Sequence, residues 1–465
     1  MLFSTPLPYS RDATAYYAAI ADLPWAVWLD SGGRGRFDIL VAQPVVTLIT
    51  RGVQTEITDV TGIRYSTNDP FKLIRELLGS QQESKPHIKF AGGALGYWGY
   101  DLARRWLEIS NQALDAEYLP EMAVGIYDWS LQLDHQEKTA QLLSYKRYPQ
   151  TEEIIPLILE RLQGKFNLPL PDNFQVHGKV TSNFSRANYE ATFSVVQEYL
   201  RAGDCYQINL AQRFAAQASG DAFAAYCKLR LLSPAPYSAF LNLPQAQILC
   251  ASPERFLLVQ QGHVETRPIK GTRPSVADVQ QDESLVQDLR SNPKDRAENL
   301  MIVDLLRNDL SKNCVPGSVR VPKLFEVESY ATVHHLVSTV TGDLAAGRDA
   351  LALLRDCFPG GSITGAPKQR AMQIIEQLEP QRRGVYCGAI GYAGFDGNMD
   401  CNIAIRTLVY AGGEIRCWAG GGIVADSKAG AEYQETLDKA AAMLELLRSF
   451  GGAYTKEEIN NDHLA

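Results

Sequence analysis

Residues 185–214, SRANYEATFSVVQEYLRAGDCYQINLAQRF, predict a helix followed directly by a strand. Apolar side chains recur there at the spacing that places them on one helical face, namely Tyr189, Phe193, Val196 and Leu200. Ser185 is suited to cap the start of this helix and Gly203 to end it. A strand over about residues 206–214 should follow. The carboxy-terminal half of the chain is therefore expected to mix helices with strands.

Other strand-like runs lie in the amino-terminal half. Residues 26–29 and 45–49 are short and apolar, and residues 92–100 combine glycines with aromatic side chains. Glycines in such a strand allow close packing against its neighbours. Because the strands do not alternate regularly with helices, antiparallel sheets flanked by helices are favoured over a parallel doubly wound sheet.

Residues 164–185 are interpreted as a connector. The segment contains Pro169 and Pro171 and lacks both helical and alternating periodicity. It separates an amino-terminal region, residues 1–165, from a carboxy-terminal region, residues 185–450. The sequence shows no repeat of fixed period and no low-complexity segment, which argues against solenoids and propellers.

Composition excludes several classes of protein. Of 465 residues, 45% are hydrophobic and 21% charged, the profile of a soluble globular protein. With 45 basic and 53 acidic residues, a net charge of -8 and no basic block, nucleic acid is not an expected partner. Eight scattered cysteines without a C-x-x-C motif indicate a reducing compartment, not a disulfide framework. There is neither a signal-like amino terminus nor an apolar run long enough to span a membrane, so we expect a cytoplasmic protein.

Lys270 is a candidate nucleophile. It lies in the run PIKGT, residues 268–272, and follows Glu254 of SPERF, residues 252–256, which could act as an acid. A lysine amine attacks carbon only when neutral, so its pKa must be lowered by burial or by nearby positive charge. An isolated Lys-Gly pair is more commonly a solvated turn, and the neighbouring motifs are what favour the chemical interpretation.

Carboxylates at helical spacing predict a magnesium site. On a helix over residues 430–439, Glu432, Glu435 and Lys439 share a face that is separate from the apolar stripe. Oxygen ligands of this kind suit Mg²⁺, although the same pattern could be an exposed charged face. Glu298, near the start of a second helix over residues 294–305, could complete the site.

Two glycine-rich segments predict anion binding. Residues 419–424 end a strand with three successive glycines, where backbone N–H groups could approach a carboxylate. This run is not a dinucleotide fingerprint. Residues 358–368 open a helix but do not match a P-loop, so a carboxylate is favoured over a phosphate. His334 and His335 lie in a strand-like run and must face opposite sides of it.

Together these motifs resemble the chorismate-utilising enzymes, which include anthranilate synthase, isochorismate and salicylate synthases and aminodeoxychorismate synthase. The resemblance spans about residues 185–448 and extends to residues 92–105 and 122–129. Within the family, the residue at position 270 is small in anthranilate synthases and lysine in component I of aminodeoxychorismate synthases, so Lys270 favours the second group. Isochorismate and salicylate synthases carry a water-activating lysine where this chain has Gln207, which argues against water as the nucleophile.

The resemblance implies one large α+β unit like that of anthranilate synthase component I. Two antiparallel sheets would pack as a sandwich with helices outside, and the active site would lie between the sheets. Residues 1–165 would form the amino-terminal part and residues 185–450 the chorismate-binding catalytic part of this single unit.

The resemblance also implies a role for each candidate residue. Mg²⁺ would be held against the ring carboxylate of chorismate by Glu298, Glu432 and the neighbouring Glu435. The enolpyruvyl carboxylate would be fixed by Tyr386, Arg406, Lys439 and the backbone around Gly420 and Gly422. The ring would be lined by His335 and Ser362.

The implied reaction is amination of chorismate at C4. Lys270 would add at C2 while Glu254 protonates the departing 4-hydroxyl, and ammonia would then attack C4 and expel the lysine. The product would be 4-amino-4-deoxychorismate, a precursor of 4-aminobenzoate and folate, which makes the enzyme an amino-group transferase. None of the eight cysteines has the setting of a glutaminase nucleophile, so ammonia is expected from a separate glutamine amidotransferase subunit, component II.

Two alternatives remain at this stage. The first is anthranilate synthase component I, which adds ammonia at C2 and eliminates pyruvate. The second is a non-catalytic amino-acid-binding protein, since related large subunits bind tryptophan in the amino-terminal sandwich. The corresponding positions here are Ser31, Arg34, Gly35, Arg36, Phe37, Pro236, Tyr237 and Ser238. The glycine-rich run over residues 31–37 departs from the pattern expected of that loop.

Overall fold

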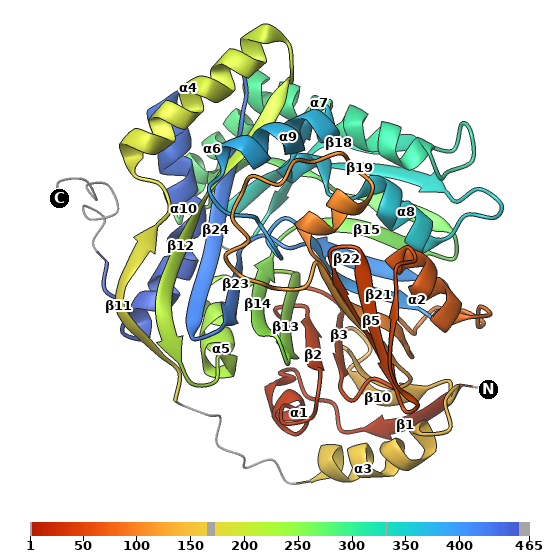
Figure 1. Cartoon of the computed structure of the whole chain (residues 1–465). Helices are drawn as coiled ribbons and strands as arrows, with labels where there is room; N and C mark the ends of the chain where they lie inside the picture. The colour runs from red at the N-terminus through yellow and green to blue at the C-terminus, as the bar shows by residue number, and fades with distance from the viewer. Residues whose placement is uncertain (1, 165–172, 331–332, 455–465) are drawn as a thin grey trace.

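Two antiparallel sheets pack face to face and helices surround them (Figure 1). The computed structural model describes residues 2–164, 173–330 and 333–454, and within these ranges each sheet contains twelve strands. The predicted α+β sandwich is therefore confirmed. None of the helices in the described ranges is long and apolar enough to cross a membrane.

The first sheet joins strands from both halves of the chain. Its order is β1 (Phe3–Leu7), β10 (Thr139–Ser144), β9 (Ser130–Asp134), β3 (Phe37–Val41), β2 (Ala26–Asp30), β13 (Tyr237–Leu243), β14 (Ala246–Ser252), β23 (Thr407–Ala411), β24 (Glu414–Ile423), β12 (Gln207–Ser219) and β11 (Gln175–Ser182), with the short β20 (Gly365–Ala366) paired to β12. The two halves of the sequence meet where β2 pairs with β13.

The second sheet is built in the same mixed way. Its order is β17 (Ile269–Pro274), β19 (Val333–Asp343), β16 (His263–Thr266), β15 (Arg255–Gln260), β22 (Met399–Ile403), β21 (Ala389–Gly394), β7 (Gly93–Trp98), β8 (Met122–Tyr127), β4 (Val46–Arg51), β5 (Gln54–Asp59) and β6 (Gly62–Ser66), with β18 (Arg320–Ser329) paired to β19. Here the halves meet where β21 pairs with β7. The division of the chain into regions 1–165 and 185–450 stays a prediction.

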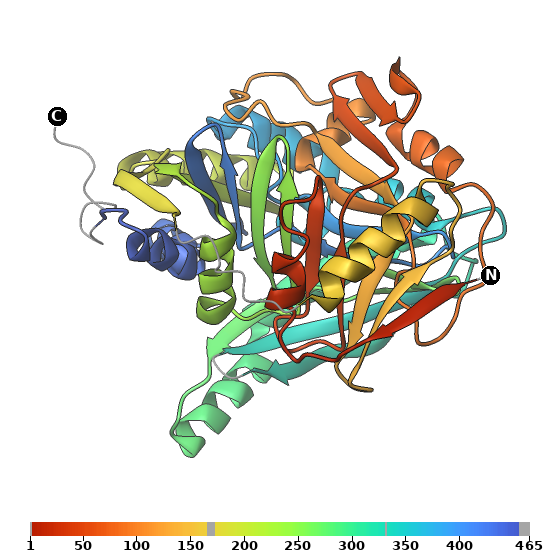
Figure 2. The same ribbon diagram turned by 90° about the horizontal axis from the view of Figure 1, so that it is seen from below.

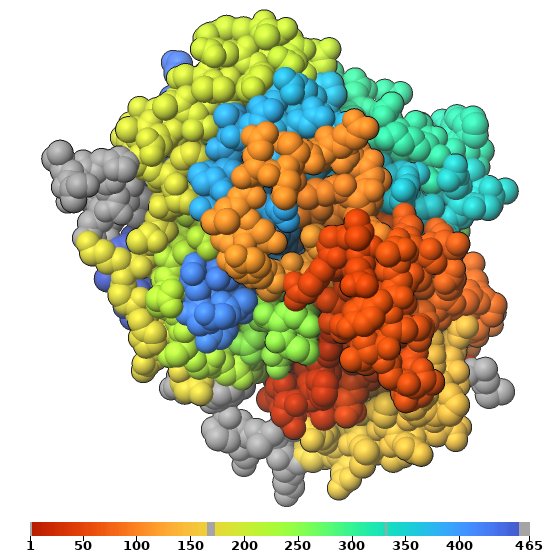
Figure 3. Space-filling model, viewed as in Figure 1, coloured from red at the N-terminus to blue at the C-terminus, as the bar shows by residue number. Residues whose placement is uncertain are grey.

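The helices cover the outer faces and the ends of the sandwich. They are α1 (Thr14–Ala18), α2 (Pro70–Leu78), α3 (Thr151–Gln163), α4 (Arg186–Ala202), α5 (Phe223–Leu232), α6 (Val279–Ser291), α7 (Pro293–Ser311), α8 (Ala350–Cys357), α9 (Lys368–Leu378) and α10 (Ala429–Ser449), with the 3₁₀ turns η1 (Tyr100–Arg105) and η2 (Gly361–Ile363). Figures 1 and 2 show α4, α5 and α10 gathered beside β11, β12 and β24. Of these helices, α4 and α10 pack on β24, which carries the glycine-rich run, and α4 lies at the molecular surface (Figure 3).

The quoted segment folds as its sequence predicts. The hydroxyl of Ser185 accepts a hydrogen bond from the backbone N–H of Asn188 at 3.0 Å, and α4 begins at Arg186. Gly203 ends the helix with φ +79°, a left-handed conformation that favours glycine. The strand β12 follows, longer than predicted, because its pairing with β24 continues to Gln217.

The predicted connector contains a strand. β11 lies within residues 164–185 and pairs with β12 at the edge of the first sheet, so the prediction of an irregular segment is wrong there. The register shifts between His177 and Thr181, and most of the side chains are exposed, which removes the alternation that would have indicated a strand. Pro169 and Pro171 lie outside the described residues.

Alternation along the strands directs neighbouring side chains into different hydrophobic cores. Val27 packs between the sheets, whereas Trp28 packs between the first sheet and its covering helices. In β7, a Cβ atom added at Gly96 would lie 2.1 Å from the carbonyl oxygen of Ala123 on β8. The close strand packing predicted from the glycines of residues 92–100 is therefore confirmed.

Candidate active site

A cavity of about 640 Å³ lies between the ends of the two sheets. Strands β12 and β24 form one side and β17 and β19 the other, and helices α7 and α10, the turn η2 and connecting loops complete the lining. Every residue predicted for catalysis, chorismate or Mg²⁺ lines it: Glu254, Lys270, Glu298, His335, Ser362, Tyr386, Arg406, Gly420, Gly422, Glu432, Glu435 and Lys439. The roles themselves stay predictions, but the fold brings all of these residues to one cavity.

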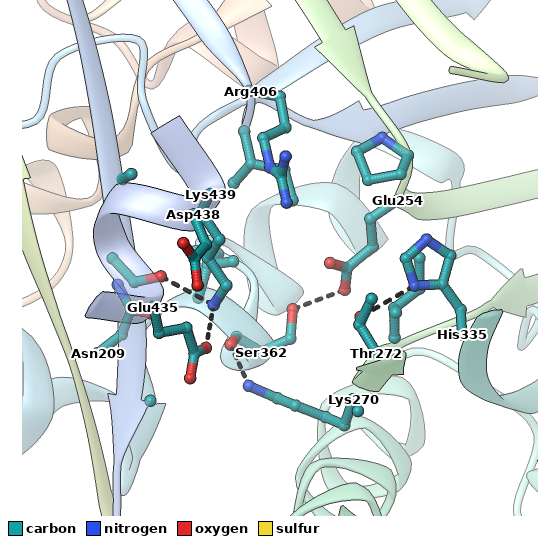
Figure 4. A pocket seen from close by; sticks show the side chains of 18 of the residues that line it. Asn209, Glu254, Lys270, Thr272, His335, Ser362, Arg406, Glu435, Asp438 and Lys439 are labelled. Atoms are coloured by element: carbon teal, nitrogen blue, oxygen red, sulfur yellow. Dashed lines mark hydrogen bonds and ion pairs between the residues drawn. The ribbon is translucent and has the colours of Figure 1, made fainter. Parts of the chain in front are cut away.

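Glu254 and Lys270 meet at Ser362 (Figure 4). The hydroxyl of Ser362 donates to Oε1 of Glu254 at 2.8 Å, and Nζ of Lys270 donates to the carbonyl oxygen of Ser362 at 2.9 Å. Ser362 lies in η2, and Glu254 in the turn between β14 and β15. The two groups are therefore anchored on opposite sides of one residue.

Burial moves the pKa of each group toward the form that its predicted role needs. Desolvation raises the pKa of Glu254, against the opposing effects of Ser362 and Lys270. Desolvation also lowers the pKa of Lys270, although Glu298 and Glu254 act in the other direction. Burial thus shifts the pKa of the carboxyl upward and that of the amine downward within one cavity.

A bulge in β17 accompanies the placement of Lys270. The pairing of β17 with β19 shifts between Ile269 and Thr272, and Gly271 between them has φ +85°. A Cβ atom added at Gly271 would lie 2.9 Å from the side chain of Leu289. Bulges of this kind redirect neighbouring side chains, and here the lysine turns into the cavity.

Three carboxylates and two ammonium groups form the acidic end of the cavity. Nζ of Lys439 lies 2.6 Å from Oε1 of Glu435 and donates to the carbonyl oxygen of Gly420 at 3.0 Å. Nζ of Lys294 lies 3.8 Å from Oε1 of Glu298 and 3.8 Å from Oε1 of Glu432.

The three carboxylates do not titrate alike. Burial raises the pKa of Glu298 and of Glu432. For Glu435 burial acts in the same direction, but the charge and hydrogen bond of Lys439 outweigh it, so its pKa is lowered.

These residues fit the predicted magnesium ion. In the described part of the chain, no three acidic, histidine or cysteine side chains are gathered closely enough to form a metal site as they stand. However, Oε2 of Glu432 is buried without a hydrogen-bond partner. A Cβ atom added at Gly421 would lie 3.0 Å from that oxygen and 3.4 Å from Oε1 of Glu435, so a larger residue would crowd both carboxylates. An all-oxygen donor set with one free acceptor suits Mg²⁺.

A cationic and aromatic wall lies above the acidic end. The ring of Tyr386 stacks on that of Trp418 with centroids 6.0 Å apart and planes at 8°. Arg406 has φ +51°, a conformation that is uncommon outside glycine, and burial lowers the pKa of its guanidinium. Nδ1 of His335 lies 3.1 Å from Oγ1 of Thr272, and burial lowers the pKa of His335 to about 4, so this ring is neutral at physiological pH.

Several lining residues were not assigned a role from the sequence. Asn209, Thr272, Lys294, Trp418 and Asp438 all face the cavity. Trp418 could have been found, because it shares a strand face with Gly420 and Gly422 at a spacing of two residues. Nδ2 of Asn209 is buried without a partner, a fact that only the assembled pocket reveals.

Arg383 braces the pocket from behind. Its guanidinium makes three kinds of contact: two hydrogen bonds to Glu379, at 2.9 and 2.6 Å, one to the carbonyl oxygen of Ile363 at 2.9 Å, and one to that of Asn209 at 2.7 Å. Both partners of the ion pair are buried, and Oε1 of Glu379 also accepts the backbone N–H of Ala211. One side chain therefore joins η2 to β12, two segments that line the cavity.

A second cavity, of about 510 Å³, contains every residue predicted for tryptophan. Its lining includes Ser31, Arg34, Gly35, Arg36, Phe37, Pro236, Tyr237 and Ser238. The glycine-rich loop brings these segments together, since a Cβ atom at Gly32 would lie 2.4 Å from the carbonyl oxygen of Ala235. Oγ of Ser31 and Nε of Arg267 are buried there without partners. The binding of tryptophan stays a prediction.

Comparisons with known proteins give consistent matches over most of the chain. A sequence model of the family described as chorismate binding enzyme matches residues 26–445. Aminodeoxychorismate synthase component 1 from Klebsiella aerogenes is 50% identical over 452 residues, which cover 95% of this chain and 98% of that protein. The Escherichia coli (strain K12) protein of the same name is 47% identical over 455 residues, with 95% and 97% covered. The crystal structure of anthranilate synthase component I from Streptococcus pneumoniae superimposes with a TM-score of 0.79 at 33% identity, over 88% of this chain and 92% of that chain.

Replacing Arg383 by Met should destabilise the protein strongly. The substitution leaves Glu379 buried without its partner, which costs about 3–5 kcal/mol of unfolding free energy. Denaturant unfolding followed by circular dichroism would measure the loss. Arg448→Met, which removes an exposed ion pair with Glu445, serves as the control and should leave the unfolding midpoint nearly unchanged. An Arg383→Met protein as stable as the wild type would show that the ion pair is not a structural requirement.

Proposed function

Because the chain belongs to the chorismate-binding enzyme family, we propose that it converts chorismate and ammonia to 4-amino-4-deoxychorismate. The observation that carries this assignment is the placement of Lys270 and Glu254 on either side of Ser362, within one enclosed cavity. The product would serve the synthesis of 4-aminobenzoate and folate. Identities of 50% and 47% to proteins named for this reaction support the assignment.

The first step joins the enzyme to the ring. The neutral amine of Lys270 forms a bond to C2, the ring double bonds shift, and the bond between C4 and its oxygen breaks. Glu254 gives its proton to the departing hydroxyl, which leaves as water. The pKa shifts that burial imposes on both groups favour this step, since they widen the pH range in which the amine is neutral and the acid protonated.

The second step replaces the enzyme with nitrogen. Ammonia forms a bond to C4, the double bonds shift back, and the amine of Lys270 leaves C2 in its neutral form. The new C4 ammonium returns one proton to the Glu254 carboxylate, so the acid is restored. His335 is neutral at the pH of catalysis, so we assign it to lining the substrate ring and not to donating a proton.

The charged walls suit a dianionic substrate. Arg406 and Lys439, with the hydroxyl of Tyr386 and the backbone of Gly420 and Gly422, would hold the enolpyruvyl carboxylate. Burial raises the pKa of Tyr386 well above its ordinary value, so its hydroxyl remains a hydrogen-bond donor. Glu298, Glu432 and Glu435 would hold Mg²⁺, which when bound supplies positive charge opposite the ring carboxylate.

Lys270→Ala should slow amination of chorismate roughly 10³-fold or more, because the other two lysines that line the pocket, Lys294 and Lys439, are both paired with carboxylates. Product formation from chorismate, ammonium and Mg²⁺ would be followed by chromatography, and intact-mass spectrometry without ammonium should detect an adduct on wild-type protein alone. Lys323→Ala, at an exposed ion pair with Glu326, is the matched control.

Wild-type rates from the Lys270→Ala protein would rule out the covalent route. Fluorescent anthranilate as the main product would instead favour the reaction of anthranilate synthase, to whose component I the fold is similar.

Ammonia would come from a separate glutaminase subunit. A glutaminase needs a reactive thiolate, and all eight cysteines lie within the described residues, seven of them buried. Burial raises the pKa of each thiol, to about 11 for Cys205 and Cys227 and to about 12 for Cys387 and Cys417. The direction is the same for Cys250, Cys314, Cys357 and Cys401. None of these groups is activated in the way such chemistry requires.

The isolated chain should therefore form product with ammonium salts at alkaline pH and remain inactive with glutamine as the sole nitrogen source. Alkaline pH raises the fraction of ammonia over ammonium. The assay compares the two nitrogen sources with the same enzyme preparation, so the ammonium reaction is the internal control. Appreciable turnover with glutamine and no second protein would contradict the need for a partner subunit.

The second cavity is proposed to bind tryptophan, since two buried polar atoms there lack partners and aromatic side chains line it. Titration calorimetry should detect binding to the wild-type chain. Ser31→Leu should weaken it by about tenfold or more, because the larger side chain fills the cavity and removes the hydroxyl. Ser80→Leu, at an exposed position outside the cavity, is the control. Unchanged affinity in the Ser31 variant would place tryptophan elsewhere.

A further inference from the structure

The ammonium group of Lys294 lies between two of the three acidic side chains proposed to hold Mg²⁺. Its Nζ atom is 3.8 Å from Oε1 of Glu298 and 3.8 Å from Oε1 of Glu432. The Lys294 side chain is 51% exposed, whereas that of Glu432 is 4% exposed. A half-exposed cation thus reaches in from the solvent side toward a buried carboxylate.

A positive charge at the position of Lys294 is not favoured by the helix itself. α7 begins at Pro293, so Lys294 lies in the first turn, where the backbone N–H groups already carry partial positive charge. A cation there is disfavoured, and Asn292 rather than a charged group caps the turn by accepting from the N–H groups of Lys294 and Asp295. The two carboxylates offset this disadvantage.

The other contacts of Glu432 and Glu435 leave one oxygen of Glu432 available to a cation. Glu435 is paired with Lys439 at 2.6 Å, and Oε1 of Glu432 accepts the hydroxyl of Ser427 at 2.6 Å. Oε2 of Glu432 is buried and has no hydrogen-bond partner. At 3.8 Å, the contacts of Lys294 are ion pairs without the geometry of hydrogen bonds, so little specific bonding is lost when the ammonium leaves.

We propose that Lys294 is an internal counter-cation that occupies the space between Glu298 and Glu432 and moves out to solvent when Mg²⁺ binds. This inference rests on the metal site of the proposed function. While the ion is absent, the ammonium limits repulsion between the carboxylates and keeps them in place. Its flexible stem allows the exchange, and its competition weakens the affinity for the metal.

Chemical labelling tests the displacement directly. The full-length chain is treated with a limiting amount of an acetylating reagent, with either a chelator or saturating Mg²⁺, and modification is quantified by peptide mass spectrometry. Lys294 should be acetylated several-fold faster with Mg²⁺, because its amine is released into solvent. Lys323, an exposed lysine paired with Glu326, should react equally in both conditions. Equal labelling of Lys294 with and without Mg²⁺ would overturn the proposal.

Metal affinity provides the second measurement. Titration calorimetry should show that Lys294→Met binds Mg²⁺ about threefold to tenfold more tightly than the wild type, since one competing ion pair is removed. Arg296→Met makes the same change in net charge two residues further along α7. Its guanidinium lies over the ring of Phe325 and away from the carboxylates, so its affinity should match that of the wild type.

A third variant distinguishes failure of the metal site from failure of the role proposed for Lys294. Glu432→Gln should lose Mg²⁺ binding if the metal site is correct. If Glu432→Gln loses binding while Lys294→Met keeps the wild-type affinity, the site stands and the role of Lys294 is overturned. If the wild-type chain binds no Mg²⁺ by calorimetry, both the metal site and the inference built on it are wrong.

Discussion

The buried ion pair between Arg383 and Glu379 is the constraint on which the pocket depends. Two buried charges are stable only when every donor and acceptor is paired, and here the guanidinium meets this demand by bonding to the carbonyl groups of Ile363 and Asn209. Those two residues belong to different segments, η2 and β12. Satisfying the charge therefore fixes the distance between them.

Geometry at the reacting end follows from that fixed distance. Ser362 precedes Ile363 in η2, so its hydroxyl and carbonyl are held in place, and they in turn orient Glu254 and Lys270. The same packing buries Glu254 and partly buries Lys270. Desolvation then moves the pKa of the carboxyl up and that of the amine down, which is the combination that an acid and a nucleophile require. Structural rigidity and chemical activation thus have one physical origin.

The two cavities are connected through consecutive residues. Glu254 lines the reacting pocket, and Arg255, the next residue, lines the second cavity. Arg255 is held by Asp400 on β22 and by Glu265 on β16, so the beginning of β15 is tied to the second sheet. A ligand in the second cavity would contact a segment whose preceding residue is the proposed acid.

Local pattern was sufficient for much of this protein. The helix and strand of residues 185–214 and the grouping of Glu432, Glu435 and Lys439 on one face depend on spacing along the chain, and the motifs identified the family. The edge strand β11 was missed because exposure removed its alternation. The partnership of Arg383 with Glu379 looks like an ordinary pair four residues apart, and the position of Lys294 between two carboxylates joins separate helices. Only the tertiary structure decided these features, because burial, pKa and charge pairing depend on which distant segments exclude water from one another.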